Sequence, residues 1–159
     1  MNNTLILNKE IDFPASKESI WNLLTNPEMT RQYMFGCEVL SEWKQGSSIT
    51  WKGKSENGKE VTYVKGEIIE ILKGEKVTFS MLDPNMGIED VPENYVNLTY
   101  NLEKSEDSTR LRLIQGDFAT VENGKKRYEE AIKGWEMVFP LMEKIITDQI
   151  TKSENKRVL

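Results

Sequence analysis

The last third of the chain carries the pattern that most restricts its fold. Between residues 125 and 150, apolar side chains recur every three or four positions, the spacing of one face of an α-helix. The opposite positions hold charged residues such as Glu129, Lys133 and Glu136. A helix of this length with one apolar face has to pack against an equally long apolar surface. The apolar face consists of Tyr128, Ile132, Trp135, Phe139, Met142 and Ile146.

Several strand patterns precede this helix and predict the surface that it covers. Each is a short run rich in β-branched and aromatic residues, bounded by turn residues. Asn57-Gly58 is a pair typical of tight hairpin turns, and most other linkers are also short, so neighbouring strands are expected to be antiparallel. The strands are expected at residues 5–13, 37–43, 47–53, 60–72, 76–82, 95–103 and 109–118.

Two short helices are expected between the first strand and the rest of the sheet. Pro14 ends the first strand, and Ser16 is a suitable N-cap for a helix that closes at Asn26. Pro27 can begin a second helix that runs to Tyr33, because proline is favoured at the first helical position. The predicted fold class is therefore α+β: a curved antiparallel sheet of about six or seven strands, wrapped around the long C-terminal helix.

Composition and charge indicate how many domains the chain forms and which kinds of partner it does not bind. No repeat or linker divides the chain, so we expect one domain over 1–159, with a core of about 4–150 and a flexible tail at 151–159. The net charge of −5 and the scattered basic residues argue against nucleic-acid binding. No run approaches the roughly 20 apolar residues of a membrane helix, and no signal peptide is recognised. We expect no membrane insertion and a cytoplasmic location.

The absence of histidine limits the chemistry that this chain can perform. The sequence has no histidine and a single cysteine, Cys37. Ser-His-Asp triads, Cys-His dyads, His-ligated metal sites and internal disulfides are therefore excluded. No Gly-x-Gly pair occurs, which excludes the dinucleotide fingerprint. We assign no catalytic residue, no metal ligand and no cofactor. We interpret Cys37 as structural, because Arg31 is the one basic neighbour that could lower the pKa of its thiol and no histidine is present.

A set of short motifs runs in order along most of the chain, from about residue 8 to 148. They are Ile11-Asp12-Phe13-Pro14-Ala15, Ile20-Trp21, Leu24-Thr25-Asn26-Pro27-Glu28, Gly66-Glu67-Ile68-Ile69-Glu70-Ile71, Leu98-Thr99-Tyr100-Asn101-Leu102-Glu103 and Gly134-Trp135. In this order and spacing they resemble the START-like SRPBCC superfamily. More narrowly, they are similar to its branch of activator of heat-shock-protein ATPase (Aha-type) homologues.

The resemblance implies a helix-grip fold with a hydrophobic cavity between the sheet and the C-terminal helix. Members of the superfamily bind apolar or amphipathic molecules, and some are cyclases, aromatases or hydrolases. This chain departs from the pattern at Gln115, where many relatives place a histidine. A chaperone contact is implied only through the namesake co-chaperones, whose separate N-terminal chaperone-binding domain does not fit into 159 residues.

Large side chains on the inner faces of the strands and the helix are candidates for lining that cavity. By strand alternation, Trp51 shares a face with Ile49, and Gln115 shares one with Leu113. Gln115 either orients a polar group of a ligand or is satisfied by a neighbour, because a buried amide without partners is costly. An ordinary core is the alternative for the apolar residues. The candidate ligand-binding residues are Trp51, Tyr63, Phe79, Met81, Tyr100, Leu113, Gln115, Trp135, Phe139 and Met142.

Two further features leave alternatives open. Without a bulge near Gly66, Glu67 would face the helix and become an acid inside the cavity, whereas a bulge would reconcile Ile68 with Ile69. The segment 82–94 is longer than a hairpin requires, and long loops are often lids or binding loops. We therefore treat it as a hypothetical lid over the mouth of the cavity, with its apolar side chains inward.

Three functions are compatible with these patterns. The first is a small-molecule binding protein that holds an apolar or amphipathic ligand between the sheet and the C-terminal helix. The alternatives are a cyclase/aromatase-like or hydrolase-like enzyme that uses a tyrosine or carboxylate, and a co-chaperone-like interaction module. A cavity with convergent ionisable groups would favour the enzyme, and a filled cavity with a broad exposed apolar patch would favour the module.

Overall fold

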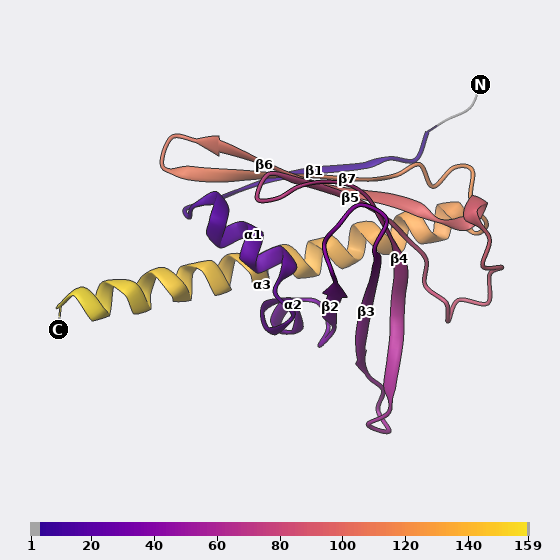
Figure 1. Ribbon diagram of the computed structural model, residues 1–159, viewed down its shortest axis with the longest axis horizontal. Helices are drawn as coiled ribbons and strands as arrows, with labels where there is room; N and C mark the ends of the chain where they lie inside the picture. The colour runs from indigo at the N-terminus through magenta and orange to yellow at the C-terminus, as the bar shows by residue number, and fades with distance from the viewer. Residues whose placement is uncertain (1–3, 159) are drawn as a thin grey trace.

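The predicted strands form one antiparallel sheet that curves around a long helix, which confirms the α+β fold class (Figure 1). The computed structural model describes residues 4–158. Within them, a sheet of seven strands has the order β1-β7-β6-β5-β4-β3-β2. The strands are β1 (Leu7–Phe13), β2 (Glu38–Ser41), β3 (Ser48–Lys54), β4 (Glu60–Leu72), β5 (Lys76–Met81), β6 (Val96–Ser105) and β7 (Ser108–Gly116). The helices are α1 (Lys17–Thr25), α2 (Pro27–Tyr33), the short 3-10 helix η1 (Pro92–Asn94) and α3 (Gly124–Val158).

Strands that are consecutive in sequence are neighbours in the sheet, except for β1 and β2. β1 pairs with β7 rather than with β2, so β1 and β2 form the two edges of the sheet. The helices α1 and α2 connect these edges, and α2 packs against both β2 and α3. In Figure 1 the β3–β4 hairpin turns away from β1, β5, β6 and β7, so the sheet is strongly bent. The bend brings the α2–β2 connection to the same side of the sheet as α3.

The two short helices begin where the sequence indicates. The Oγ atom of Ser16 accepts a hydrogen bond from the Ser19 amide at 3.1 Å and caps α1. Asn26 ends α1 and also caps α2, because its Oδ1 atom accepts from the Glu28 amide at 3.0 Å. Pro27 occupies the first turn of α2, where its missing N–H removes no helical hydrogen bond.

Alternation along the strands determines which side chains face α3. Ile49 and Trp51 are buried on β3, and Leu111, Leu113 and Gln115 are buried on β7. These residues share the inner face of the sheet, as the two-residue period requires. Burial of large apolar side chains from this face and from α3 is the main source of stability for such a fold.

β4 contains a bulge near the point where its pairing passes from β3 to β5. The pairing with β5 shifts between Ile68 and Glu70, but this bulge does not bring both isoleucines to the inner face as we expected, because Ile68 is buried while Ile69 is exposed. This observation decides the alternative at Glu67: its side chain is exposed and lies on the outer face of the sheet. There it borders a polar hollow that also includes Thr50 and Ser80, residues that alternate with inward-facing neighbours. Glu67 is therefore not an acid of the inner cavity.

The C-terminal helix is longer than its apolar pattern indicates. α3 runs from Gly124 to Val158, so residues 151–158 have helical backbone where we expected a flexible tail. The reason lies in helix propensity, because the segment contains lysine, glutamate and arginine but no glycine or proline to end the helix. Pro140 is tolerated inside α3, and its side chain is exposed.

Candidate functional site

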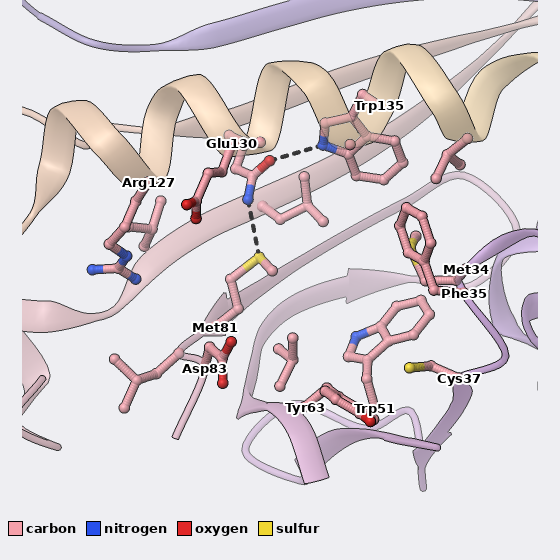
Figure 2. Close-up of a pocket in the computed structure, with 18 of the residues that line it drawn as sticks. Met34, Phe35, Cys37, Trp51, Tyr63, Met81, Asp83, Arg127, Glu130 and Trp135 are labelled. Carbon is pink, nitrogen blue, oxygen red and sulfur yellow. Dashed lines mark hydrogen bonds between the residues drawn. The ribbon is translucent and has the colours of Figure 1, made fainter. Parts of the chain in front are cut away.

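A pocket of about 550 Å³ lies between the inner face of the sheet and α3 (Figure 2). Most of its wall is apolar or aromatic, with a few polar groups, as is usual in pockets for small molecules. Its volume falls within the roughly 300–1,000 Å³ typical of such sites. The lining residues are Met34, Phe35, Cys37, Trp51, Tyr63, Val64, Met81, Leu82, Asp83, Met86, Val96, Leu98, Tyr100, Gln115, Phe118, Arg127, Glu130, Ala131, Gly134, Trp135 and Val138.

The structure divides the predicted site residues into two groups. The group that lines this pocket consists of Trp51, Tyr63, Met81, Tyr100, Gln115 and Trp135. The group that does not line it consists of Phe79, Leu113, Phe139 and Met142. Phe79, Leu113 and Met142 have no exposed surface and fill the core. Alternation identifies which side chains point inward, but only the curvature of the sheet decides where the interior stays hollow.

Gln115 joins β7 to α3 across the wall of the pocket. Its side chain is 5% exposed, and its Oε1 atom accepts a hydrogen bond from the indole Nε1–H of Trp135 at 2.9 Å. Its amide nitrogen lies 3.3 Å from the Sδ atom of Met81, as the dashed lines in Figure 2 show. The buried amide is thus satisfied by its neighbours, one of the two interpretations that its position allows. Sulfur is a weak acceptor, so the amide retains donor capacity toward the pocket.

One end of the pocket is polar. Figure 2 shows Arg127, Glu130 and Asp83 there, away from Met34, Phe35 and Cys37. Arg127 is only 8% exposed, and its Nη1 atom donates to the carbonyl of Asn94 at 2.8 Å. Desolvation lowers the pKa of Arg127, and the nearby Asp83 carboxylate opposes that shift. The pocket therefore combines a long apolar wall with one charged end.

Sequence reasoning missed this polar end. Arg127 lies in the Lys125-Lys126-Arg127 run, which is typical of a solvated helix start. A signal was available, because Arg127, Ala131 and Trp135 are spaced by four residues and so lie on one face of the helix. The side chain of Arg127 is buried because this face of α3 covers the pocket.

The opposite end is formed by the connection between α2 and β2. Phe35 is 63% exposed and also lines the pocket, so the pocket reaches the surface there. Its φ of 53° lies in the left-handed region, and the following Gly36 has a φ of 81°, which together turn the chain tightly into β2. Cys37 is buried, and desolvation raises the pKa of its thiol, so the thiol stays protonated near neutral pH.

The segment 82–94 contributes part of the wall. Leu82, Asp83 and Met86 line the pocket, whereas Ile88 and Val91 do not. The Asn85 side-chain amide donates to the carbonyl of Thr62 at 2.9 Å and ties the segment to β4. Its role as a lid remains a prediction.

The hydrogen bonding of two buried tyrosines, Tyr100 and Tyr33, leads to a testable prediction. Tyr100 is 1% exposed and its hydroxyl has no hydrogen-bond partner among the described residues, and burial raises the pKa of this phenol. Tyr33 is equally buried, but its hydroxyl donates to the carbonyl of Leu23 at 2.8 Å. We expect Tyr100→Phe to be at least as stable as the unmodified protein, because no hydrogen bond is lost.

The matched control is Tyr33→Phe, which removes the same atom but leaves the Leu23 carbonyl without its donor. It should lower the free energy of unfolding by about 1 kcal/mol. Urea denaturation followed by circular dichroism measures both variants. An equal loss in the two variants would contradict the assigned hydrogen bonding of Tyr100.

The described residues contain neither a cluster of potential metal ligands nor a membrane-spanning helix. Within residues 4–158, no group of three or more carboxylate or thiol side chains is arranged to hold a metal ion. In the same range, no helix is both long enough and apolar enough to cross a lipid bilayer.

The chain is similar to one protein family and to several solved structures. The model of the family described as Activator of Hsp90 ATPase homolog 1-like protein matches residues 14–147. No curated protein matches the chain. The solution structure of ChR145 from Cytophaga hutchinsonii is 29% identical, with a TM-score of 0.75, and the match covers 95% of this chain and 99% of that chain.

Two further solved structures share the fold at lower identity. CalU16 from Micromonospora echinospora is 16% identical with a TM-score of 0.66, and the match covers 96% of this chain and 82% of CalU16. DynU16, a protein of the dynemicin biosynthetic locus, is 12% identical with a TM-score of 0.68. That match covers 91% of this chain and 48% of DynU16. At these identities the likeness shows the fold alone.

Proposed function

The chain belongs to the Activator of Hsp90 ATPase homolog 1-like family of the SRPBCC superfamily, and from this premise we propose that it binds one small apolar or amphipathic molecule between the sheet and α3. The observation that carries the proposal is the pocket of about 550 Å³, whose wall is mostly apolar and aromatic. Protein interiors are normally close-packed, so a pocket of this size that opens to the surface between the sheet and α3 provides room for a ligand.

The distribution of polar groups supports an amphipathic ligand. The aromatic wall formed by Trp51, Tyr100 and Trp135 suits a flat or chain-like apolar body. The charged end at Asp83, Arg127 and Glu130 suits a polar group that remains partly hydrated. Such a ligand would enter beside the exposed Phe35 or beside the charged end. We further propose a cytoplasmic location, since the only cysteine, Cys37, is a free thiol.

A second candidate is a chemical step on the bound ligand, in the manner of a cyclase or hydrolase. The observation that favours it is the convergence of two carboxylates, Asp83 and Glu130, with Arg127 at one end of the pocket. An acid-base function would need a carboxylate within hydrogen-bond reach of the ligand's reacting atom. A chaperone contact receives less support, because the cavity is hollow rather than filled.

Ligand binding is tested by blocking the pocket from the helix. A Cβ atom added at Gly134 would meet no other atom within 4 Å, and Gly134 lines the pocket. We expect Gly134→Leu to fold normally and to fill part of the hollow. The unmodified protein should show ligand-dependent increases in melting temperature with some members of a panel of fatty acids, flavonoids and polyketides, and Gly134→Leu should lose them.

The control variant is Met137→Leu, on the same helix, where the native side chain is 60% exposed. It should keep the ligand response of the unmodified protein. Native mass spectrometry of the purified protein then identifies any retained ligand and its stoichiometry. If no member of the panel raises the melting temperature of the unmodified protein, or if Gly134→Leu responds as it does, the proposed function is wrong.

A further inference from the structure

Two residues that line the pocket each carry a buried polar atom without a hydrogen-bond partner. The two groups are the indole Nε1–H of Trp51 and the hydroxyl of Tyr100. Trp51 is 4% exposed and Tyr100 is 1% exposed, so neither side chain is compensated by bulk water. Leaving a buried donor without a partner costs free energy, and native proteins rarely do so without a reason.

Both atoms belong to residues that line the same pocket. Among the described residues, they are the buried side-chain nitrogen and oxygen atoms without a partner, and both residues line the pocket. The other buried polar side chains of the pocket are paired: Gln115 with Trp135, and Arg127 with Asn94. The hydroxyl of Tyr33, which lies outside the pocket lining, is paired as well. The unpaired groups therefore both belong to side chains that border the hollow.

The chemistry of these groups indicates what would pair with them. An indole N–H is a donor only, and a phenol hydroxyl with a raised pKa stays protonated and can donate. The complement common to both is therefore an acceptor oxygen, such as that of a ketone, quinone or ether. Trp51 lies on β3 and Tyr100 on β6, so the two donors mark two separate positions on the wall.

We propose that the pocket selects apolar ligands that carry hydrogen-bond-accepting oxygens, and that Trp51 and Tyr100 are the residues that determine this preference. The proposal rests on the proposed function and adds the chemical class of the ligand. Pure hydrocarbon bodies of the same shape would leave both donors unpaired, so the pocket binds them less tightly than their hydrophobicity predicts. Both atoms are shielded in the free protein, so a ligand oxygen reaches them through small side-chain rotations of the kind that often accompany binding.

The test compares two probes of nearly equal shape, benzophenone and diphenylmethane, which differ by one carbonyl oxygen. Each is titrated into ¹⁵N-labelled protein, and dissociation constants are measured from the NMR signals of pocket residues. The ratio of the two constants is then compared between the unmodified protein and the double variant Trp51→Phe/Tyr100→Phe. This ratio removes the intrinsic difference in hydrophobicity between the probes, because that difference is the same for both proteins.

We expect the double variant to lose about fivefold or more of the relative preference for benzophenone, since one hydrogen bond per occupied donor is removed. The chain has four tryptophans, and the indole N–H signal of Trp51, assigned by its loss in Trp51→Phe, should shift with benzophenone but not with diphenylmethane. Tyr100→Phe alone serves as the variant with the smallest structural change, and Tyr33→Phe is the control that should leave the ratio unchanged.

The outcomes separate the inference from the proposed function. If both probes bind and their ratio is the same in the two proteins, the preference assigned to Trp51 and Tyr100 is wrong while ligand binding stands. If neither probe perturbs any signal of a pocket residue at its solubility limit, the preference is contradicted, and the thermal-shift panel with Gly134→Leu decides the proposed function separately.

Discussion

Gly66→Ala is expected to be strongly destabilising. A Cβ atom at residue 66 would lie 1.6 Å from the carbonyl oxygen of Ser80 and 2.5 Å from its carbonyl carbon. Both are backbone atoms of β5, so no side-chain rotation relieves the overlap. The strands have to separate where they are held by the paired hydrogen bonds between Lys65 and Leu82, each 2.9 Å long.

We expect Gly66→Ala to lower the free energy of unfolding by about 4 kcal/mol or more. Losses of this size are exceptional for single substitutions and arise from severe steric overlap or disruption of the core. For a chain of this size, the melting temperature should fall by roughly 10 °C or more. Thermal and urea denaturation followed by circular dichroism measure the change. Soluble expression at a fixed temperature provides a second measure if the variant does not fold.

The matched control is Gly134→Ala, the same substitution at a helical glycine where a Cβ meets no atom within 4 Å. It should raise stability by up to about 1 kcal/mol, because alanine is the better helix former. A melting temperature for Gly66→Ala within about 2 °C of the unmodified protein would show that β4 and β5 are not in contact at this point.

The second large effect is expected for Trp135→Ala. The Trp135 side chain is 6% exposed and packs edge-on against Tyr100, with ring centroids 6.3 Å apart, and against Phe139 at 5.5 Å. Truncation removes these contacts and also the donor that satisfies the Oε1 atom of Gln115. We expect a loss of about 3–5 kcal/mol, the usual cost of removing a large buried aromatic side chain.

Trp135→Phe separates packing from hydrogen bonding. It keeps an aromatic ring but leaves Gln115 without the indole donor, so an intermediate loss of about 1–3 kcal/mol is expected. Met137→Ala, two residues further along α3 and exposed, should change stability by less than about 0.5 kcal/mol. Urea denaturation of the three variants gives the comparison. A loss for Trp135→Ala no larger than that for Met137→Ala would mean that α3 does not pack on the sheet as described.

Much of the fold follows from local patterns in the chain. The apolar stripe of α3, the N-cap at Ser16 and the Asn57-Gly58 turn each depend on residues close in sequence, so the sequence alone identifies them. Alternation likewise places Trp51 and Gln115 on the inner face of the sheet. The four-residue spacing of Arg127, Ala131 and Trp135 places Arg127 on the same helix face as these two residues. Its burial also depends on which turn of α3 covers the pocket, and only the tertiary structure decides that.

By itself, the sequence determined the fold class, the order of the elements and the absence of histidine-based chemistry, because these depend on residue type and spacing. Only the tertiary structure decided where the interior is hollow. Trp51 and Phe79 both belong to the inner face, yet Trp51 lines the pocket and Phe79 fills the core. The difference arises from the bend at β4, which carries part of the sheet away from α3. Such a bend depends on contacts between strands, which local periodicity does not encode.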